Sequence, residues 1–88
     1  MKVLFKSSFA KDLRKIKEKK IKQQVLGIIQ QVEKASDLQD IDDLKKLQSV
    51  DKYYRLKMGD YRFGLVLEQD TLLFVRFLHR KDIYRYFP

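Results

Sequence analysis

The sequence has no cysteine and a single histidine, His79. Without thiols, the chain can form no disulfide bond and offers no thiolate to a metal ion. Structural zinc sites are built from several Cys and His ligands, which one histidine cannot supply. We therefore expect a protein that uses no metal and no other cofactor.

Long apolar runs are also absent. No stretch approaches the ~18 to 20 consecutive apolar residues that a transmembrane helix needs. The first residues, Met1 to Lys6, are too few and too charged to contain the apolar region of a signal peptide. The expectation is a soluble, cytoplasmic protein.

The chain does contain enough apolar side chain for one core. Hydrophobic residues make up 44% of its 88 positions, and they include five Tyr and six Phe. A chain of this length buries roughly 60 per cent of its unfolded surface and cannot build a second core. We expect residues 1–88 to form a single domain.

Positive charge is in clear excess. Twenty Lys and Arg stand against twelve Asp and Glu, which gives a net charge of +8. Two basic segments, residues 1–35 and 52–88, flank a short acidic one. Such a balance suits nucleic acid, an anionic surface or an acidic protein partner, and charge alone does not choose among them.

The first part of the chain predicts one strand and two helices. Residues 3–5 form a short apolar run typical of a strand, and Ser7 or Ser8 is suited to cap the helix that follows. Apolar residues then recur every three or four positions, as they do on one face of a helix. The two stripes are Phe9, Leu13 and Ile16, then Ile21, Val25, Ile28, Ile29 and Val32.

The second part predicts strands. Residues 36–50 are polar with isolated apolar positions, and they predict a packed connection with a helical turn. From residue 53 the apolar period changes to two, which is typical of strands with one buried face. The predicted strands are 53–58, 61–68 and 71–78, with turns at Gly59-Asp60 and Gln69-Asp70. Residues 80–87 predict a helix or a turn.

This order of elements predicts an α+β fold. The expected architecture is a small twisted antiparallel sheet, made of the N-terminal strand and the three-strand meander, with the two helices packed on one face. The expected core residues are Phe63, Leu65, Val75 and Phe77 of the sheet, against Leu13, Val25 and Ile29 of the helices. The open face would then carry cations that alternate with core residues: Arg55, Lys57 and Arg62.

Three segments, "FKSSFAKDLRKI", "YRLKMGDYRF" and "HRKDIYRYF", resemble the RelE/ParE superfamily of type II toxin–antitoxin toxins. The resemblance runs from Val3 to Tyr86 and implies the same small sheet with two helices on one side. It leaves two activities open. RelE-like members cut messenger RNA on the ribosome with a metal-free set of basic residues and a tyrosine, whereas ParE-like members act on DNA gyrase and usually lack that set.

The resemblance also implies a catalytic set. Its members lie on either side of the turn of the predicted β-hairpin and just after the last strand. His79 is an alternative to the arginine beside it. They are Arg55, Lys57, Arg62, His79, Arg80 and Tyr84. The full set favours the messenger-RNA endonuclease branch.

RNA can be cleaved without a metal when its own 2′-hydroxyl attacks the adjacent phosphorus. The reaction needs a base for that hydroxyl, donors for the phosphate oxygens and an acid for the leaving 5′-oxygen. Lys57 is the candidate base because neighbouring like charges favour its neutral form, and the planar fork of Arg62 suits the phosphate. Arg80 or His79 would be the acid, and Tyr84 would stack a base or orient the attacking group.

Basic residues of the predicted helices form a second candidate set. Lys11, Arg14, Lys15 and Lys22 lie opposite the apolar stripes. Such a face is usually only solvated, but here it could contact RNA phosphates.

Each feature also has an ordinary structural interpretation. Cations on a strand face often serve only solubility and edge protection. A histidine that ends a strand is often a cap, and the aromatic residues at 84, 86 and 87 can close a core. Three functions therefore remain open: a ribosome-dependent messenger-RNA endonuclease restrained by a cognate antitoxin protein, a ParE-like gyrase inhibitor, and an RNA- or ribosome-binding module that does not cut. The resemblance implies a prokaryotic, cytoplasmic protein that acts on the ribosome and messenger RNA.

Overall fold

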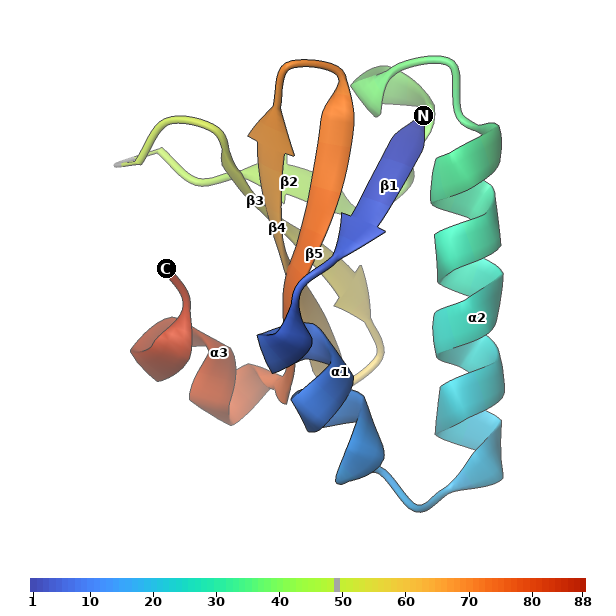
Figure 1. The fold of residues 1–88 in the computed structure, drawn as a ribbon. Helices are drawn as coiled ribbons and strands as arrows, with labels where there is room; N and C mark the ends of the chain where they lie inside the picture. The colour runs from blue at the N-terminus through green and yellow to red at the C-terminus, as the bar shows by residue number, and fades with distance from the viewer. Residues whose placement is uncertain (49) are drawn as a thin grey trace.

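The computed structural model describes residues 1–48 and 50–88 (Figure 1). Helices and strands are arranged as the α+β class requires, and that prediction is confirmed. The elements in chain order are β1 (Lys2–Phe5), α1 (Ser7–Arg14), α2 (Lys19–Lys34), a 3-10 turn (Leu38–Asp40), β2 (Leu44–Lys46), β3 (Tyr53–Met58), β4 (Tyr61–Glu68), β5 (Thr71–His79) and α3 (Arg80–Tyr86).

Among the described residues, the sheet has five strands in the order β1-β5-β4-β3-β2. β2, β3, β4 and β5 pair antiparallel, but β1 pairs with β5 in parallel, so the prediction of a wholly antiparallel sheet is wrong at this edge. A hairpin fixes the direction of the strands that it joins. The other strands lie between β1 and β5 along the chain, so no tight turn fixes the relative direction of these two strands. Parallel strands need a long connection, and the chain between β1 and β5 supplies one.

The connection at residues 36–50 contains the expected helical turn and an unexpected strand. Asp37 caps the turn, since its side chain accepts a hydrogen bond from the Gln39 amide at 2.9 Å. β2 then adds an edge strand next to β3, with Lys45 opposite Arg55. Three residues are too few to show an alternating pattern, which is why the sequence did not predict this strand. Residue 49, which also belongs to the predicted packed connection, lies outside the described residues.

The core lies between the sheet and the two long helices. Phe63, Leu65 and Phe77 are buried as predicted, and Val25 of α2 packs against them. Val75 is only half-buried, so its assignment to the core is wrong.

A β-bulge explains this correction. Phe63 pairs with Phe77, whereas Leu65 pairs with Phe74, so the register shifts at Gly64 and Leu65 and leaves one extra residue on β5. A bulge changes the side on which subsequent side chains lie. Phe74 therefore takes the core position expected for Val75.

The start of α1 also differs from expectation. The N-cap position is Lys6, and no side chain caps the helix. The Ser8 hydroxyl instead donates a hydrogen bond to the Val75 carbonyl oxygen at 2.6 Å. The serine therefore ties α1 to the bulge of β5.

α3 confirms the helix expected near the C-terminus. It lies on the opposite side of the sheet from α2 (Figure 1). Ile83 and Phe87 are buried, whereas Tyr84 and Tyr86 are exposed. The open face is thus partly covered by the C-terminal residues.

Among the described residues, no helix is long and apolar enough to cross a membrane.

Candidate active site

The β3–β4 hairpin places cations on the open face of the sheet. Leu56 and Phe63 pair across the hairpin and are buried on the helix-covered face. The neighbouring pair, Lys57 and Arg62, therefore projects to the opposite face. The turn between the strands needs a residue with positive φ, and Gly59 supplies it with φ 57°.

A groove of about 480 Å³ contains four of the six predicted catalytic residues: Arg55, Lys57, Arg62 and Tyr84. The remaining lining comes from β2 and the segments on either side of it. These residues are Asp43, Lys45, Lys46, Leu47 and Gln48. The groove is therefore strongly cationic, as binding a phosphate backbone requires.

Arg55 is anchored to the C-terminal residues. Its Nη2 donates a hydrogen bond to the Phe87 carbonyl oxygen at 3.2 Å, and its Cζ lies 4.5 Å from the centre of the Tyr84 ring. Its Nε is buried and has no hydrogen-bond partner among the described residues. Arg55 thus joins the C-terminal residues to the groove.

Arg62 is also held, but from the side of the hairpin turn. Its Nη1 donates to the carbonyl oxygens of Gly59 and Tyr61, each at 2.8 Å. Lys57 is exposed, and no ion pair to its ammonium group occurs among the described residues. Both cations line the groove, so both are placed to meet a ligand there.

His79 does not join the groove. Its Nδ1 accepts a hydrogen bond from the Lys81 amide at 3.2 Å, so it caps α3. The histidine pairs across the sheet with Tyr61, whose ring stacks on the buried Phe77 at 4.9 Å. It therefore lies on the face covered by α1 and α2, as the capping interpretation expects.

Arg80 also lies outside the groove, although it is close to the hairpin. Its Nε is 3.9 Å from a carboxylate oxygen of Asp60, and its backbone amide donates to the Asp60 carbonyl oxygen at 2.7 Å. Both side chains are largely exposed, so this ion pair holds Arg80 only weakly.

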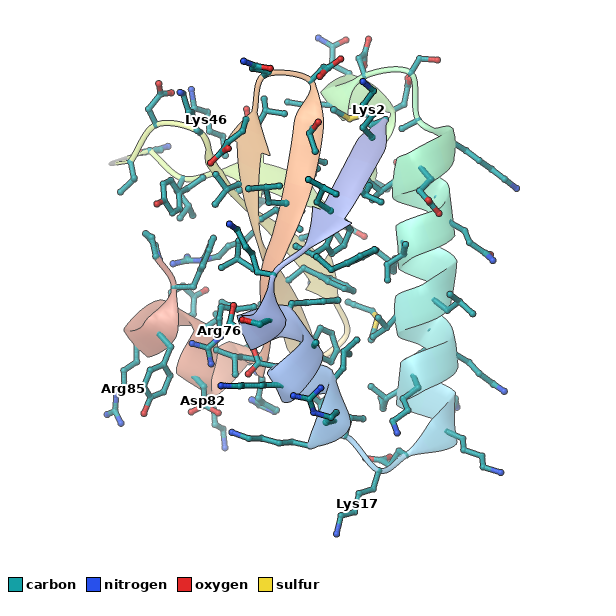
Figure 2. The ribbon with its side chains drawn as sticks, viewed as in Figure 1. Lys2, Lys17, Lys46, Arg76, Asp82 and Arg85 are labelled. Atoms are coloured by element: carbon teal, nitrogen blue, oxygen red, sulfur yellow. The ribbon has the colours of Figure 1, made fainter. Side chains whose placement is uncertain are left out.

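The second candidate set is exposed but lies elsewhere. Lys11, Arg14, Lys15 and Lys22 belong to or adjoin α1 and α2, which cover the face opposite the groove. Arg14 and Lys22 line a small hollow with Leu13 and Val25. Cations are spread over the whole molecule, as Lys2, Lys17, Lys46 and Arg85 illustrate in Figure 2.

The sequence analysis did not identify Lys45 and Lys46 as groove residues. The available signal was a pair of lysines inside an otherwise acidic segment, which the missed strand β2 brings next to Arg55. Lys46 Nζ lies 3.2 Å from an Asp51 carboxylate oxygen, and this hydrogen bond lowers the pKa of Asp51.

A further ion pair holds α1 to β5. Asp12 is buried and accepts hydrogen bonds from Arg76 at 2.8 and 3.1 Å and from the Phe77 amide at 2.9 Å. Hydrogen bonding to Asp12 raises the pKa of Arg76 above its usual range. Figure 2 shows Arg76 beside α1, away from the groove, so this arginine is structural.

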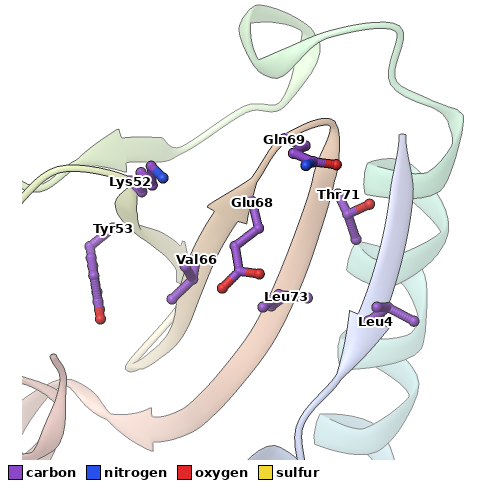
Figure 3. Close-up of a pocket in the computed structure, with 8 residues that line it drawn as sticks. All are labelled: Leu4, Lys52, Tyr53, Val66, Glu68, Gln69, Thr71 and Leu73. Atoms are coloured by element: carbon purple, nitrogen blue, oxygen red, sulfur yellow. The ribbon is translucent and has the colours of Figure 1, made fainter.

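A second hollow, of about 550 Å³, lies over β4 and β5 beside Leu4 of β1 (Figure 3). Its lining combines Leu4, Val66 and Leu73 with one lysine, Lys52, and one carboxylate, Glu68. It contains none of the predicted catalytic residues. The cationic groove is therefore the better match for a phosphate ligand.

The described part of the chain does not gather its potential metal ligands into a site. No cluster of three or more His, Cys, Asp or Glu residues is placed to hold an ion there.

The sequence and the fold have counterparts among known toxins. A family model described as the ParE toxin of the type II toxin–antitoxin system parDE matches residues 3–84. Toxin RelE3 of Methanocaldococcus jannaschii is 42% identical over the full length of both chains. The chain belongs to the RelE/ParE family of type II toxin–antitoxin toxins.

Solved structures agree with this assignment. A RelB–RelE antitoxin–toxin complex from Methanococcus jannaschii contains a chain that is 38% identical, with a TM-score of 0.81 and coverage of 97% of this chain and 99% of that one. The RelBE2 complex of Mycobacterium tuberculosis (21% identity, TM-score 0.72, covering 90% and 96%) and YafQ of E. coli (18%, 0.65, covering 93% and 96%) share the fold. The protein is a type II toxin of the RelE kind.

Proposed function

We propose that this toxin is an endoribonuclease that cuts messenger RNA on the ribosome. The observation that supports it is the meeting of Arg55, Lys57, Arg62 and Tyr84 in one open groove. These residues can supply the base, the phosphate donors and the stacking ring for a metal-free attack of the RNA 2′-hydroxyl on the adjacent phosphate, and the acid comes from Arg80 beside the hairpin turn.

Lys57 and Arg62 are the central pair of this mechanism. Lys57 accepts the proton of the attacking 2′-hydroxyl. Arg62 donates hydrogen bonds to the phosphate oxygens, whose negative charge rises as the phosphorus becomes five-coordinate. Their positions opposite each other across the hairpin let both reach one phosphate.

Tyr84 orients the RNA. Its ring is 68% exposed and faces the groove above Arg55, so a nucleobase can stack on the free side.

Arg80 is the better candidate for the acid that protonates the leaving 5′-oxygen. It is exposed, and its only ion pair among the described side chains is the weak one to Asp60 in the hairpin turn. His79 is engaged with Lys81 and Tyr61 on the other face. We assign the acid role to Arg80 when RNA is bound and a capping role to His79.

A cognate antitoxin is the proposed restraint. Relatives of this chain were solved as complexes with antitoxins. The net charge of +8 suits a partner segment whose carboxylates cover the groove.

The basic residues of the helices have a separate proposed role. They would contact ribosomal RNA by their charge alone, and they are Lys11, Arg14, Lys15 and Lys22.

Gyrase inhibition is the second candidate, because the matching family model is described as a ParE toxin. The two functions differ in what they need from the groove. A gyrase inhibitor needs neither a proton acceptor nor a hydrogen-bond donor to a phosphate. RNA cleavage fails without these two groups.

The test uses purified protein, ribosomes programmed with a defined messenger RNA, and primer extension to map cut sites. We expect cleavage by the parent and not by Lys57→Ala, with no inhibition of DNA supercoiling by gyrase. Intact messenger RNA together with inhibited gyrase would replace the proposal with the ParE-like function. Intact messenger RNA together with active gyrase would leave a binding module that does not cut.

A further inference from the structure

The C-terminal residues depend on buried anchors for their position. α3 has seven residues, and isolated helices this short are not stable in water. Its tyrosines Tyr84 and Tyr86 are exposed, whereas Ile83 is fully buried and Phe87, one residue beyond the helix, is 3% exposed. The placement of Tyr84 therefore depends on where Ile83 and Phe87 are seated.

Gly64 of β4 forms the seat of the Phe87 ring. A methyl group on Gly64 would lie 2.6, 2.7 and 2.8 Å from three carbons of that ring, closer than side-chain carbons approach one another in proteins. Tyr53 closes the seat from the side, with its ring centre 5.6 Å from that of Phe87. The ring can occupy this place only because residue 64 has no side chain.

Arg55 connects the seat to the groove. The same guanidinium donates to the Phe87 carbonyl oxygen at 3.2 Å and lies over the Tyr84 ring at 4.5 Å. It touches the buried anchor and the exposed tyrosine together. We call Gly64, Tyr53, Arg55 and Phe87 the C-terminal latch.

We propose that the C-terminal latch positions Tyr84 for the reaction, with Arg55, Gly64 and Phe87 acting as positioning residues. This assigns Arg55 a different task from Lys57 and Arg62, because its donors face the C-terminal residues. The proposal rests on the proposed function of the groove. A misplacement of about 1 Å in a reacting group lowers a rate by on the order of a hundredfold, so a displaced ring is expected to be costly.

A double-mutant cycle on Gly64 and Phe87 tests the latch. Gly64→Ala adds one methyl group, whose three nearest neighbours are all carbons of the Phe87 ring. We expect it to lower kcat roughly tenfold to a hundredfold with little change in KM, because Lys57 and Arg62 still bind the RNA. With Phe87→Ala already present, the seat is empty and the added methyl should change nothing further.

Two measurements separate positioning from loss of fold. Urea unfolding of each variant shows whether the domain is intact. Hydrogen exchange and NMR follow the Phe87 amide, which donates to the Ile83 carbonyl oxygen at 2.9 Å, and the contact between Arg55 and Tyr84. Arg85→Ala truncates an exposed side chain of the same helix and serves as the control, with kcat and Phe87 exchange expected as in the parent.

The outcomes are distinct. The latch is supported if Gly64→Ala speeds exchange at Phe87, loses the contact between Arg55 and Tyr84 and lowers kcat only when Phe87 is present. It is overturned if Gly64→Ala leaves exchange and kcat unchanged, or lowers kcat equally without Phe87. A parent protein that does not cleave RNA refutes the proposed function. In that case, hydrogen exchange at the Phe87 amide and the NMR contact between Arg55 and Tyr84 still decide whether Phe87 holds Tyr84 in place.

Discussion

Lys57 and Arg62 lie opposite each other on neighbouring strands, one pair away from the β3–β4 turn. A hairpin with so short a turn gives its last residue pairs little freedom, so the backbones of the two residues keep a fixed separation. Because the neighbouring pair, Leu56 and Phe63, is buried on the other face, the core holds these backbone positions in place.

Replacing either Lys57 or Arg62 by alanine should abolish toxicity and leave the fold intact. Truncation on the open face creates no core cavity, whereas loss of one transition-state donor typically lowers a rate by about a hundredfold or more. Primer extension on programmed ribosomes gives the rate, and circular dichroism gives the fold. Parent-like cleavage by both variants would show that the site is wrongly placed.

Arg80→Ala should also reduce cleavage strongly, whereas His79→Ala should leave the rate close to that of the parent. The reason is that Arg80 is exposed beside the hairpin turn, while His79 caps α3 on the other face. The same assay compares the two. The reverse result would assign the acid role to His79.

Leu65→Ala should destabilise the domain by about 2 to 5 kcal/mol, because it leaves a cavity in a fully buried position. The control is Val75→Ala, which removes part of a half-buried side chain at the bulge and should destabilise less. Urea unfolding measures both. Equal losses would contradict the bulge as described.

Asp12→Ala should cost about 3 kcal/mol, near the lower end of values for a broken buried ion pair, because Arg76 keeps some contact with water. It also leaves the Phe77 amide without its acceptor. Asp82→Ala, an exposed acidic residue of α3, is the control and should have little effect. A stability unchanged by Asp12→Ala would mean that this pair does not hold α1 to β5.

Association with the antitoxin should slow as salt is raised. Exposed charges are screened beyond about 8 Å at physiological ionic strength, and complementary charge mainly speeds association. Co-expression with the neighbouring open reading frame and a pull-down would supply the complex for stopped-flow measurements. A rate that does not depend on salt would indicate an apolar rather than an ionic contact, and recovery of a non-toxic monomer would count against restraint by a partner.

The sequence predicted those parts of the fold that depend on local repetition. Apolar stripes indicate the buried face of α1 and α2. Apolar alternation indicates the buried face of the strands from Arg55 to Arg62. The bulge at Val75 has no such signal, because it depends on the register between two strands. β2 is too short to alternate, and the parallel pairing of β1 depends on contacts across the whole chain.

The candidate site was predictable for similar reasons. Arg55, Lys57 and Arg62 lie on one hairpin, whose geometry follows from its turn, and they do lie together. The place of Tyr84 depends on the burial of Phe87 against Gly64, a contact between residues distant in sequence. His79 has the chemistry of a catalyst, but it lies two residues after the buried Phe77 on β5, so the period of two already places it on the helix-covered face.

The parallel edge formed by β1 has a consequence for synthesis of the toxin. Lys2 and Phe5 pair with Thr71 and Phe74, so the first strand has no partner until most of the chain has been made. At about 5 to 20 residues per second, the interval between synthesis of the two strands is roughly 3 to 14 s. Tyr84, which lines the groove, and Phe87, which anchors it, come later still. The nascent chain therefore cannot complete its groove until β5 and α3 have been synthesised, so a partly made toxin has no assembled site.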